Sequence, residues 1–229
     1  LGIKTCKTMY IRKIESVFQS WMDTPSHKPI VVKGVRQCGK TSSVVDFANK
    51  HFRHIVYLDF REHPDYKMFF TPNLNVDDII MRITAAMPDV EIEAGNTCFI
   101  FDEIQDCPRA RGSLKYFFLD GRFEVMCTGS LLGVNGYKSR EEQVEEADAS
   151  IPVGFEDIVN MYPMDFEEWL WANGIKPMHI DYLRKCLDND APVDASLHAR
   201  FRELLHQYVI VGGMPEAVTT FLNTKQIGK

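Results

Sequence analysis

Residues 28–43 read Lys28-Pro-Ile-Val-Val-Lys-Gly34-Val-Arg-Gln-Cys-Gly39-Lys40-Thr41-Ser-Ser. The run from Pro29 to Lys33 is short, apolar and rich in β-branched residues, which predicts a buried strand. Gly34 and Gly39 delimit a turn, and the apolar residues after Ser43 recur at helical spacing. A strand and a helix joined by G-x-x-x-x-G-K-T are the expected context of a phosphate-binding loop.

The groups in this loop are suited to phosphate. Glycines let the backbone curl so that its N–H groups point at phosphate oxygens, and the start of the following helix adds partial positive charge. Lys40 can reach the outer phosphates, and the Thr41 hydroxyl can ligate Mg²⁺. The expected phosphate-binding residues are Gly34, Val35, Arg36, Gln37, Cys38, Gly39, Lys40, Thr41 and Ser42. The alternative is a plain glycine turn followed by a surface lysine.

A second candidate site lies at the end of residues 96–103, which are strand-like and apolar until Asp102 and Glu103. Buried charge is costly unless it is paired, so this pair suggests a nearby cation. The carboxyl edge of an open α/β sheet is also where phosphate loops lie. We therefore expect Asp102 to be the Walker B acid that binds Mg²⁺, and Glu103 to be the general base for the attacking water. A strand that ends in a solvated turn is the alternative.

A third polar strand end follows in residues 122–130. This apolar run closes with Thr128-Gly129-Ser130. A hydroxyl there could bond the attacking water or the γ-phosphate, which makes Thr128 and Ser130 candidate catalytic residues. Without the two preceding motifs, a plain turn would be the better interpretation.

Predicted strands and helices alternate up to about residue 161, and only helices follow. The strands are 29–33, 54–60, 96–103, 122–128 and 151–161; the helices are 10–22, 41–52, 76–87, 109–119, 165–171, 177–187, 195–211 and 215–222. Residues 61–75 are expected to be mostly loop, and the acidic run 140–148 a solvated insertion. Asp165 is the expected N-cap of its helix. The pattern predicts a sheet domain followed by a small helical appendage, with a boundary near 162–165.

Composition fits a soluble globular chain of 229 residues with 45% hydrophobic and 25% charged residues. Its apolar runs are too short to span a bilayer, so no membrane partner is expected. The net charge of −6 gives no basis for non-specific nucleic-acid binding by the whole surface. Lys4, Lys7, Arg12 and Lys13 are interpreted as a solvated helix face. None of the six cysteines forms a C-x-x-C pair, which favours a reducing, cytoplasmic location.

Six motifs occur in the order found in one known family. They are Gly34-Val-Arg-Gln-Cys-Gly-Lys-Thr41, Phe101-Asp-Glu-Ile-Gln105, Ser113-Leu-Lys-Tyr-Phe117, Thr128-Gly-Ser-Leu-Leu-Gly133, Tyr162-Pro-Met-Asp-Phe-Glu-Glu-Trp-Leu170 and Gly212-Gly-Met-Pro-Glu216. Across nearly its whole length the chain resembles prokaryotic AAA-superfamily ATP-binding proteins, whose ATPase domain is often followed by a domain of unknown function. It departs from them in the acidic insertion after Gly133.

The resemblance implies an α/β, three-layer P-loop NTPase fold with an ASCE-type parallel sheet of order 5-1-4-3-2 and a C-terminal helical appendage. It implies an ATPase domain over residues 1–163 and a lid-like helical domain over 164–229. It also implies Mg²⁺-dependent ATP hydrolysis, with Thr128 or Ser130 in the sensor position. The preference for adenine depends on this resemblance alone.

Three functions remain open at this point. The first is an ATPase that changes shape with its nucleotide state. The second is a small-molecule P-loop kinase, and the third a binding module that holds nucleotide without turnover. A homo-oligomer and an unknown protein or nucleic-acid partner are both possible. An arginine finger from a neighbouring subunit could be any of Arg109, Arg111, Arg122 and Arg140, although each fits an ordinary surface arginine better.

Overall fold

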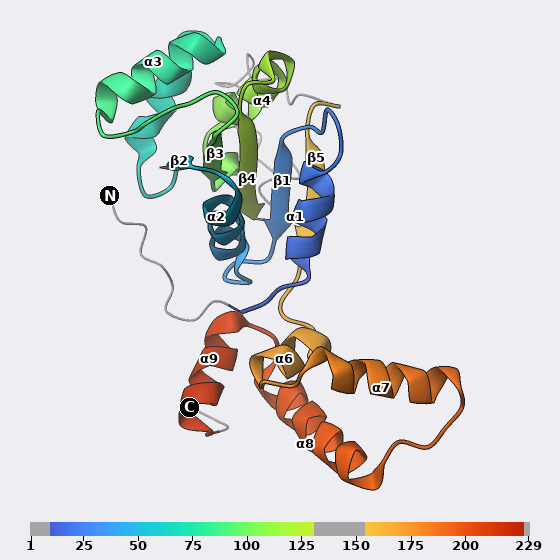
Figure 1. The fold of residues 1–229 in the computed structure, drawn as a ribbon. Coiled ribbons are helices and arrows are strands. Elements are labelled where there is room, and N and C mark those ends of the chain that lie inside the picture. The colour runs from blue at the N-terminus through green and yellow to red at the C-terminus, as the bar shows by residue number, and fades with distance from the viewer. Residues whose placement is uncertain (1–9, 131–153, 227–229) are drawn as a thin grey trace. The chain divides into compact units, whose positions relative to one another are not determined.

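The computed structural model describes residues 10–130 and 154–226, which are drawn in colour in Figure 1. Within these residues the chain divides into two compact units. The sheet unit comprises the described parts of Ser16–Arg36 and Lys40–Met161. The helical unit comprises those of Leu1–Glu15, Gln37–Gly39 and Tyr162–Lys229. The tip of the phosphate loop is thus grouped with the helical unit.

Five parallel strands form the sheet. They are β1 (Ile30–Gly34), β2 (His54–Asp59), β3 (Thr97–Asp102), β4 (Glu124–Ser130) and β5 (Asp157–Met161). Their order is β2-β3-β4-β1-β5, which confirms the expected order. The fully buried pattern of β3 explains its continuous apolar sequence, because both faces of a parallel sheet are covered by helices.

Helices cover both faces of the sheet (Figure 1). On one face α2 (Lys40–His51) contacts β1, β3 and β4, and its Phe47 ring meets Phe18 of α1 (Ile14–Met22) at a centroid distance of 5.3 Å. The other face carries α3 (Val76–Ala86) and α4 (Pro108–Asp120), which share a core with Phe99 and Phe101 of β3. The three-layer prediction is confirmed.

The prediction that residues 61–75 are mostly loop is wrong in part, because Pro64–Phe70 form a short 3₁₀ helix, η1. Pro64 suits its first turn, and Phe69 and Phe70 are buried at its end. Burial of these two rings depends on the surrounding core, which no local period reveals. The acidic run 140–148 lies outside the described residues.

The helical unit contains α6 (Phe166–Ala172), α7 (Pro177–Asp188), α8 (Ala195–Val211) and α9 (Pro215–Thr224). Asp165 caps α6 as expected, in a reciprocal capping box with Glu168. None of the helices in the described part of the chain has the length and hydrophobicity needed to cross a bilayer. The interpretation of Arg12 as a solvated residue is wrong, since it precedes α1 and is only 7% exposed.

Two of the sequence motifs meet at Gly213. The Met164 N–H donates to the Gly213 carbonyl at 2.7 Å, and the Tyr208 hydroxyl donates to the Met164 carbonyl at 3.0 Å. A Cβ at position 213 would lie 2.0 Å from the Met164 carbonyl oxygen. The glycine is therefore required by close backbone approach, which a reading of this motif as a simple break between helices does not capture.

We expect Gly213→Ala to lower the free energy of unfolding of the helical unit by about 3 kcal/mol, because backbone has to shift to admit the methyl group. Urea denaturation followed by circular dichroism measures the change. Gly112→Ala in α4 is the contrasting variant, since its Cβ would meet only Leu74 Cδ1, at 3.5 Å. That variant should gain about 0.5–1 kcal/mol from helix propensity. Unchanged stability of Gly213→Ala would contradict the close-approach argument.

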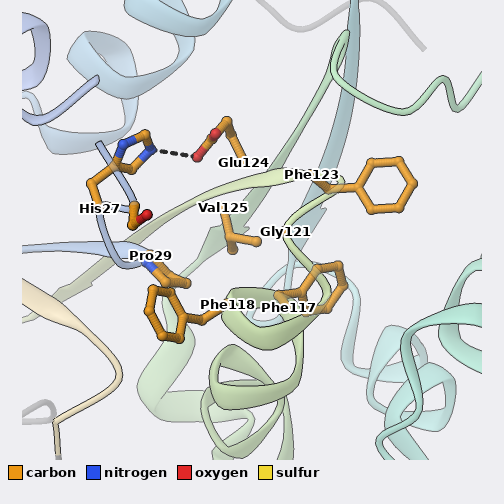
Figure 2. A pocket seen from close by; sticks show the side chains of 9 residues that line it. His27, Pro29, Phe117, Phe118, Gly121, Phe123, Glu124 and Val125 are labelled. Carbon is orange, nitrogen blue, oxygen red and sulfur yellow. Dashed lines mark hydrogen bonds and ion pairs between the residues drawn. The ribbon is translucent and has the colours of Figure 1, made fainter. Parts of the chain in front are cut away.

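A hollow of about 370 Å³ lies at the amino ends of β1 and β4 (Figure 2). Its lining includes Phe117, Phe118 and Pro29, together with the pair His27 Nε2–Glu124 Oε2 at 2.7 Å. Parallel strands place their carboxyl ends at the other edge of the sheet, so this hollow is separate from the predicted phosphate site.

Candidate functional site

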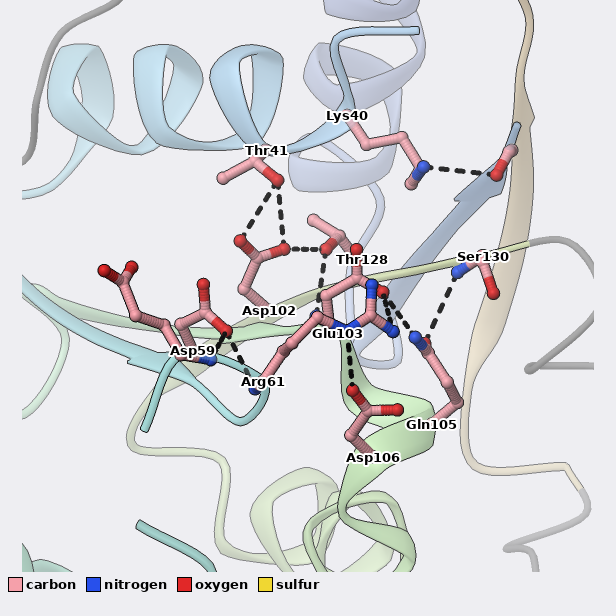
Figure 3. Close-up of polar contacts among 12 residues, drawn as sticks. Lys40, Thr41, Asp59, Arg61, Asp102, Glu103, Gln105, Asp106, Thr128 and Ser130 are labelled. Carbon is pink, nitrogen blue, oxygen red and sulfur yellow. Dashed lines mark hydrogen bonds and ion pairs between the residues drawn. The ribbon is translucent and has the colours of Figure 1, made fainter. Parts of the chain in front are cut away.

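The predicted site residues gather at the carboxyl edge of the sheet (Figure 3). Parallel register brings this about, because Asp59 at the end of β2 pairs with Asp102 at the end of β3. In the same way Gly34 at the end of β1 pairs with Ser130 at the end of β4. Side chains from four strands and the loop after β1 therefore face one region, which is where open α/β sheets bind ligands.

The loop between β1 and α2 is strongly curled. Gln37 has a φ of 62° and Gly39 a φ of 99°, so two residues of this short loop are left-handed. Val35, Arg36 and Gln37 are exposed, whereas Cys38 is buried, and α2 begins at Lys40. Alternating backbone handedness of this kind points successive N–H groups into one concavity, which suits an anion.

The Lys40 ammonium group lies inside the loop. Lys40 is 6% exposed, and its Nζ donates to the carbonyl oxygens of Gly34 and Val35 at 3.1 and 2.8 Å. It sits at the amino terminus of α2, whose first turn has no acidic residue. A buried cation beside the positive end of a helix dipole is unfavourable unless an anion compensates it. The local charge therefore favours a phosphate.

Asp102 is the centre of a hydroxyl cluster. It is 4% exposed, and the Thr41 hydroxyl lies 3.0 and 3.1 Å from its two carboxylate oxygens. The Tyr57 hydroxyl donates to Oδ2 at 2.5 Å, and the Thr128 hydroxyl donates to Oδ1. Carboxylate and hydroxyl oxygens side by side are the ligands that Mg²⁺ prefers. The donor set of Thr41 and Asp102 fits this ion.

Magnesium commonly uses one or two protein carboxylates and takes its other ligands from water and phosphate. Consistent with that, the described residues contain no group of three or more His, Cys, Asp or Glu side chains that could enclose a metal ion. A single buried carboxylate beside a hydroxyl and a phosphate loop is the arrangement such a shared site needs.

Glu103 adopts an unusual backbone conformation immediately after β3. Its φ of 52° and ψ of 50° are left-handed, which costs on the order of 1–3 kcal/mol for a residue with a side chain. Its N–H donates to Thr128 Oγ1 at 3.3 Å. Its carboxylate is approached by Arg61 Nη2 at 3.2 Å and by the Gln105 amide. Strain of this kind is characteristic of functional positions.

The two candidate sensor residues have different surroundings. Thr128 is fully buried and contacts Asp102 directly. Ser130 lies two residues further along β4, and its N–H donates to the Gln105 side-chain oxygen at 3.3 Å. Gln105 therefore links the end of β4 to Glu103. The sensor role of either residue stays a prediction.

The sequence argument missed Tyr57 and Arg61. Burial, followed by the negative charge of Asp102, raises the pKa of Tyr57 far above its ordinary value, so its hydroxyl stays protonated and donates. Arg61 Nε also binds Asp106 at 3.0 Å. Tyr57 and Asp59 alternate at the end of β2, and this period-2 spacing toward a ligand edge was the available signal.

Three of the four candidate finger arginines have partners within their own chain. Arg109 donates to the carbonyls of Phe70 and Pro72, and Arg122 pairs with Asp77 and Asp120. Arg111 is buried and forms two hydrogen bonds to the carboxylate of Glu156. Arg140 lies outside the described residues.

A parallel sheet of this order, with a curled loop before α2 and a buried carboxylate at the end of β3, defines the P-loop NTPase class. Residues 26–170 match the family model described as "AAA domain". The chain belongs to this family. Comparison with curated proteins gives no match.

Solved structures agree in fold. The Walker-type ATPase PABY2304 of Pyrococcus abyssi is 16% identical, with a TM-score of 0.54 over 100% of this chain and 72% of that one. PCH-2 of C. elegans is 13% identical, with a TM-score of 0.48 over 96% of this chain and 65% of that one. AMPPCP-bound DnaA of Aquifex aeolicus is 10% identical, with a TM-score of 0.45 over 91% and 58%. The chain thus spans less than two thirds of the latter two structures.

Proposed function

We propose that this protein binds ATP with Mg²⁺, hydrolyses it, and changes conformation with the nucleotide state. The observation that carries the proposal is the contact between Thr41, the residue after the loop lysine, and the buried carboxylate of Asp102. It brings a curled, cationic loop beside an acidic strand end. Phosphate and a divalent cation are together the ligand that neutralises both.

Each residue then has one role. The N–H groups of residues 34–42 and the Lys40 ammonium bind the phosphates, exchanging loop carbonyls for phosphate oxygens as partners of Lys40. Thr41 and Asp102 hold Mg²⁺, which would supply charge stabilisation for the leaving phosphate. Glu103 takes the proton of the attacking water, while Thr128 and Ser130 orient the groups around it. Arg61 and Gln105 position the Glu103 carboxylate.

The wider assignment follows from family membership. We propose that adenine is the base, that residues 1–163 and 164–229 act as ATPase and lid-like domains, and that the protein works in the cytoplasm. A second copy of the chain, and an unidentified protein or nucleic-acid partner, are part of the same proposal. Hydrolysis that releases the γ-phosphate would remove contacts of the loop and sensor, which is how such switches change state.

Lys40→Ala tests the proposal. We expect ATP affinity to fall about 10–100-fold, since a hydrogen-bonded charge pair is worth about 1.5–3 kcal/mol. Isothermal titration with ATP and Mg²⁺ measures the change. Lys50→Ala is the matched control, because Lys50 lies on the same helix but in an exposed pair with Asp46. Equal ATP affinity of the wild type and Lys40→Ala would refute the site.

Turnover separates the remaining functions. An ATPase releases phosphate when no acceptor other than water is present. A small-molecule kinase requires an added acceptor, and a nucleotide-holding module binds ATP without releasing phosphate. A phosphate-release assay on the wild-type protein, with and without DNA, distinguishes the three.

A further inference from the structure

A buried guanidinium in the helical unit holds the tip of the phosphate loop. Arg12 Nη1 donates to the Cys38 carbonyl at 2.8 Å, and Nη2 donates to the Tyr162 carbonyl at 2.7 Å. Its Nε forms an ion pair with Glu168 Oε1 at 3.1 Å. All four residues belong to the helical unit. Arg12 thus joins three segments that are far apart in the sequence.

The bond to Cys38 fixes the orientation of one peptide group. The Cys38 carbonyl and the Gly39 N–H belong to the same planar unit, and in a trans peptide they point in opposite directions. An arginine that holds the carbonyl on one side therefore directs the Gly39 N–H to the other side. The flanking residues, Gln37 and Gly39, are the two left-handed residues of the loop. This peptide is the one whose orientation decides the curl.

Arginine is suited to this position by its shape and by its charge partner. Its planar fork offers separate N–H groups to two carbonyls and a carboxylate, whereas a lysine offers a single point charge. Glu168 is 5% exposed and also accepts hydrogen bonds from the N–H groups of Lys13 and Asp165, at 2.7 and 3.1 Å. Because Glu168 completes the capping box of α6, the loop contact and the start of α6 share one network.

We propose that Arg12 is a positioning residue for nucleotide binding, which presents the Gly39 N–H to phosphate and couples the bound nucleotide to the start of α6. The inference rests on the proposed function. Coupling of this kind is reciprocal: if Arg12 favours nucleotide binding, the nucleotide strengthens the contacts of Arg12 with Tyr162 and Glu168 to the same extent.

The first test is the steady-state kinetics of Arg12→Lys. The Gly39 N–H binds phosphate equally in the ground state and the transition state, so KM for ATP should rise about tenfold while kcat stays within about twofold. Glu168→Gln is the matched control, since it removes the charge partner but leaves both carbonyl contacts, and its KM should change less than about twofold. A merely structural Arg12 would give equal KM changes in the two variants.

The second test does not depend on turnover. Without nucleotide, peptides that contain Gly39 should exchange amide hydrogen faster in Arg12→Lys than in Glu168→Gln. In the wild type, ADP should slow exchange severalfold in peptides covering 163–172, which needs no variant to fold. If the wild type binds no nucleotide, the proposed function fails, yet the nucleotide-free comparison still tests the clamp. Equal exchange in the two variants, or no ADP effect on α6 in a protein that binds ADP, overturns the inference.

Discussion

Replacing Glu103 with glutamine is expected to lower kcat for ATP hydrolysis by about 10²–10⁴-fold while ATP affinity stays within about twofold. Glutamine keeps the size of the side chain and its hydrogen bond with Gln105, but it cannot take a proton from water. The loop and Asp102, which bind phosphate and metal in our proposal, are untouched. Single-turnover phosphate release together with ATP titration separates the two effects.

Glu62→Gln is the control for this experiment. Glu62 is an exposed carboxylate just beyond the end of β2, with its N–H bonded to Asp59. It loses the same charge in the same region but should keep wild-type kcat. Full hydrolysis by Glu103→Gln would remove Glu103 from its role and leave the general base unassigned.

The second large effect concerns stability. Glu156→Ala should lower the free energy of unfolding by about 3–5 kcal/mol, because it leaves the Arg111 guanidinium buried without its carboxylate. The Arg111 and Glu156 side chains are 10% and 7% exposed, and two hydrogen bonds join them. They connect α4 to the segment that leads into β5. Urea denaturation, followed by tryptophan fluorescence, measures the loss.

A double variant distinguishes a lost attraction from a stranded charge. Arg111→Met combined with Glu156→Leu should recover most of the stability lost in Glu156→Ala, since both charges are then gone. By contrast, Asp46→Ala removes an exposed pair with Lys50 and should change stability by less than about 0.5 kcal/mol. Equal losses for Glu156→Ala and the double variant would show that the stability depends on the ion pair itself.

Local pattern was sufficient for most of the fold. The β-branched run before Gly34, the apolar run before Asp102 and the capping signal at Asp165 each depend on neighbours in sequence, and all three elements form as predicted. The sheet order came from the family resemblance and not from periodicity. Where burial is decided by distant residues, as at Phe69 and Phe70, the local pattern failed.

The same distinction applies to the site. Lys40, Thr41 and Asp102 lie in contiguous motifs, so their chemistry could be predicted directly. Tyr57 reaches Asp102 only because β2 and β3 pair in one particular register. Arg12 looked like a solvated basic residue, because the carbonyls that bury it belong to segments that the sequence places far away.

The position of β1 in the sheet has a consequence for how the chain acquires its structure. Ile30 pairs with Met126 on one side and with Asp157 on the other, so both neighbours of β1 are synthesised long after it. Contacts of such high sequence separation form slowly, because long loops have to close first. A nascent chain on the ribosome therefore carries its phosphate loop on an unpaired strand until Met161 has emerged. Competence for nucleotide is a late event in its maturation.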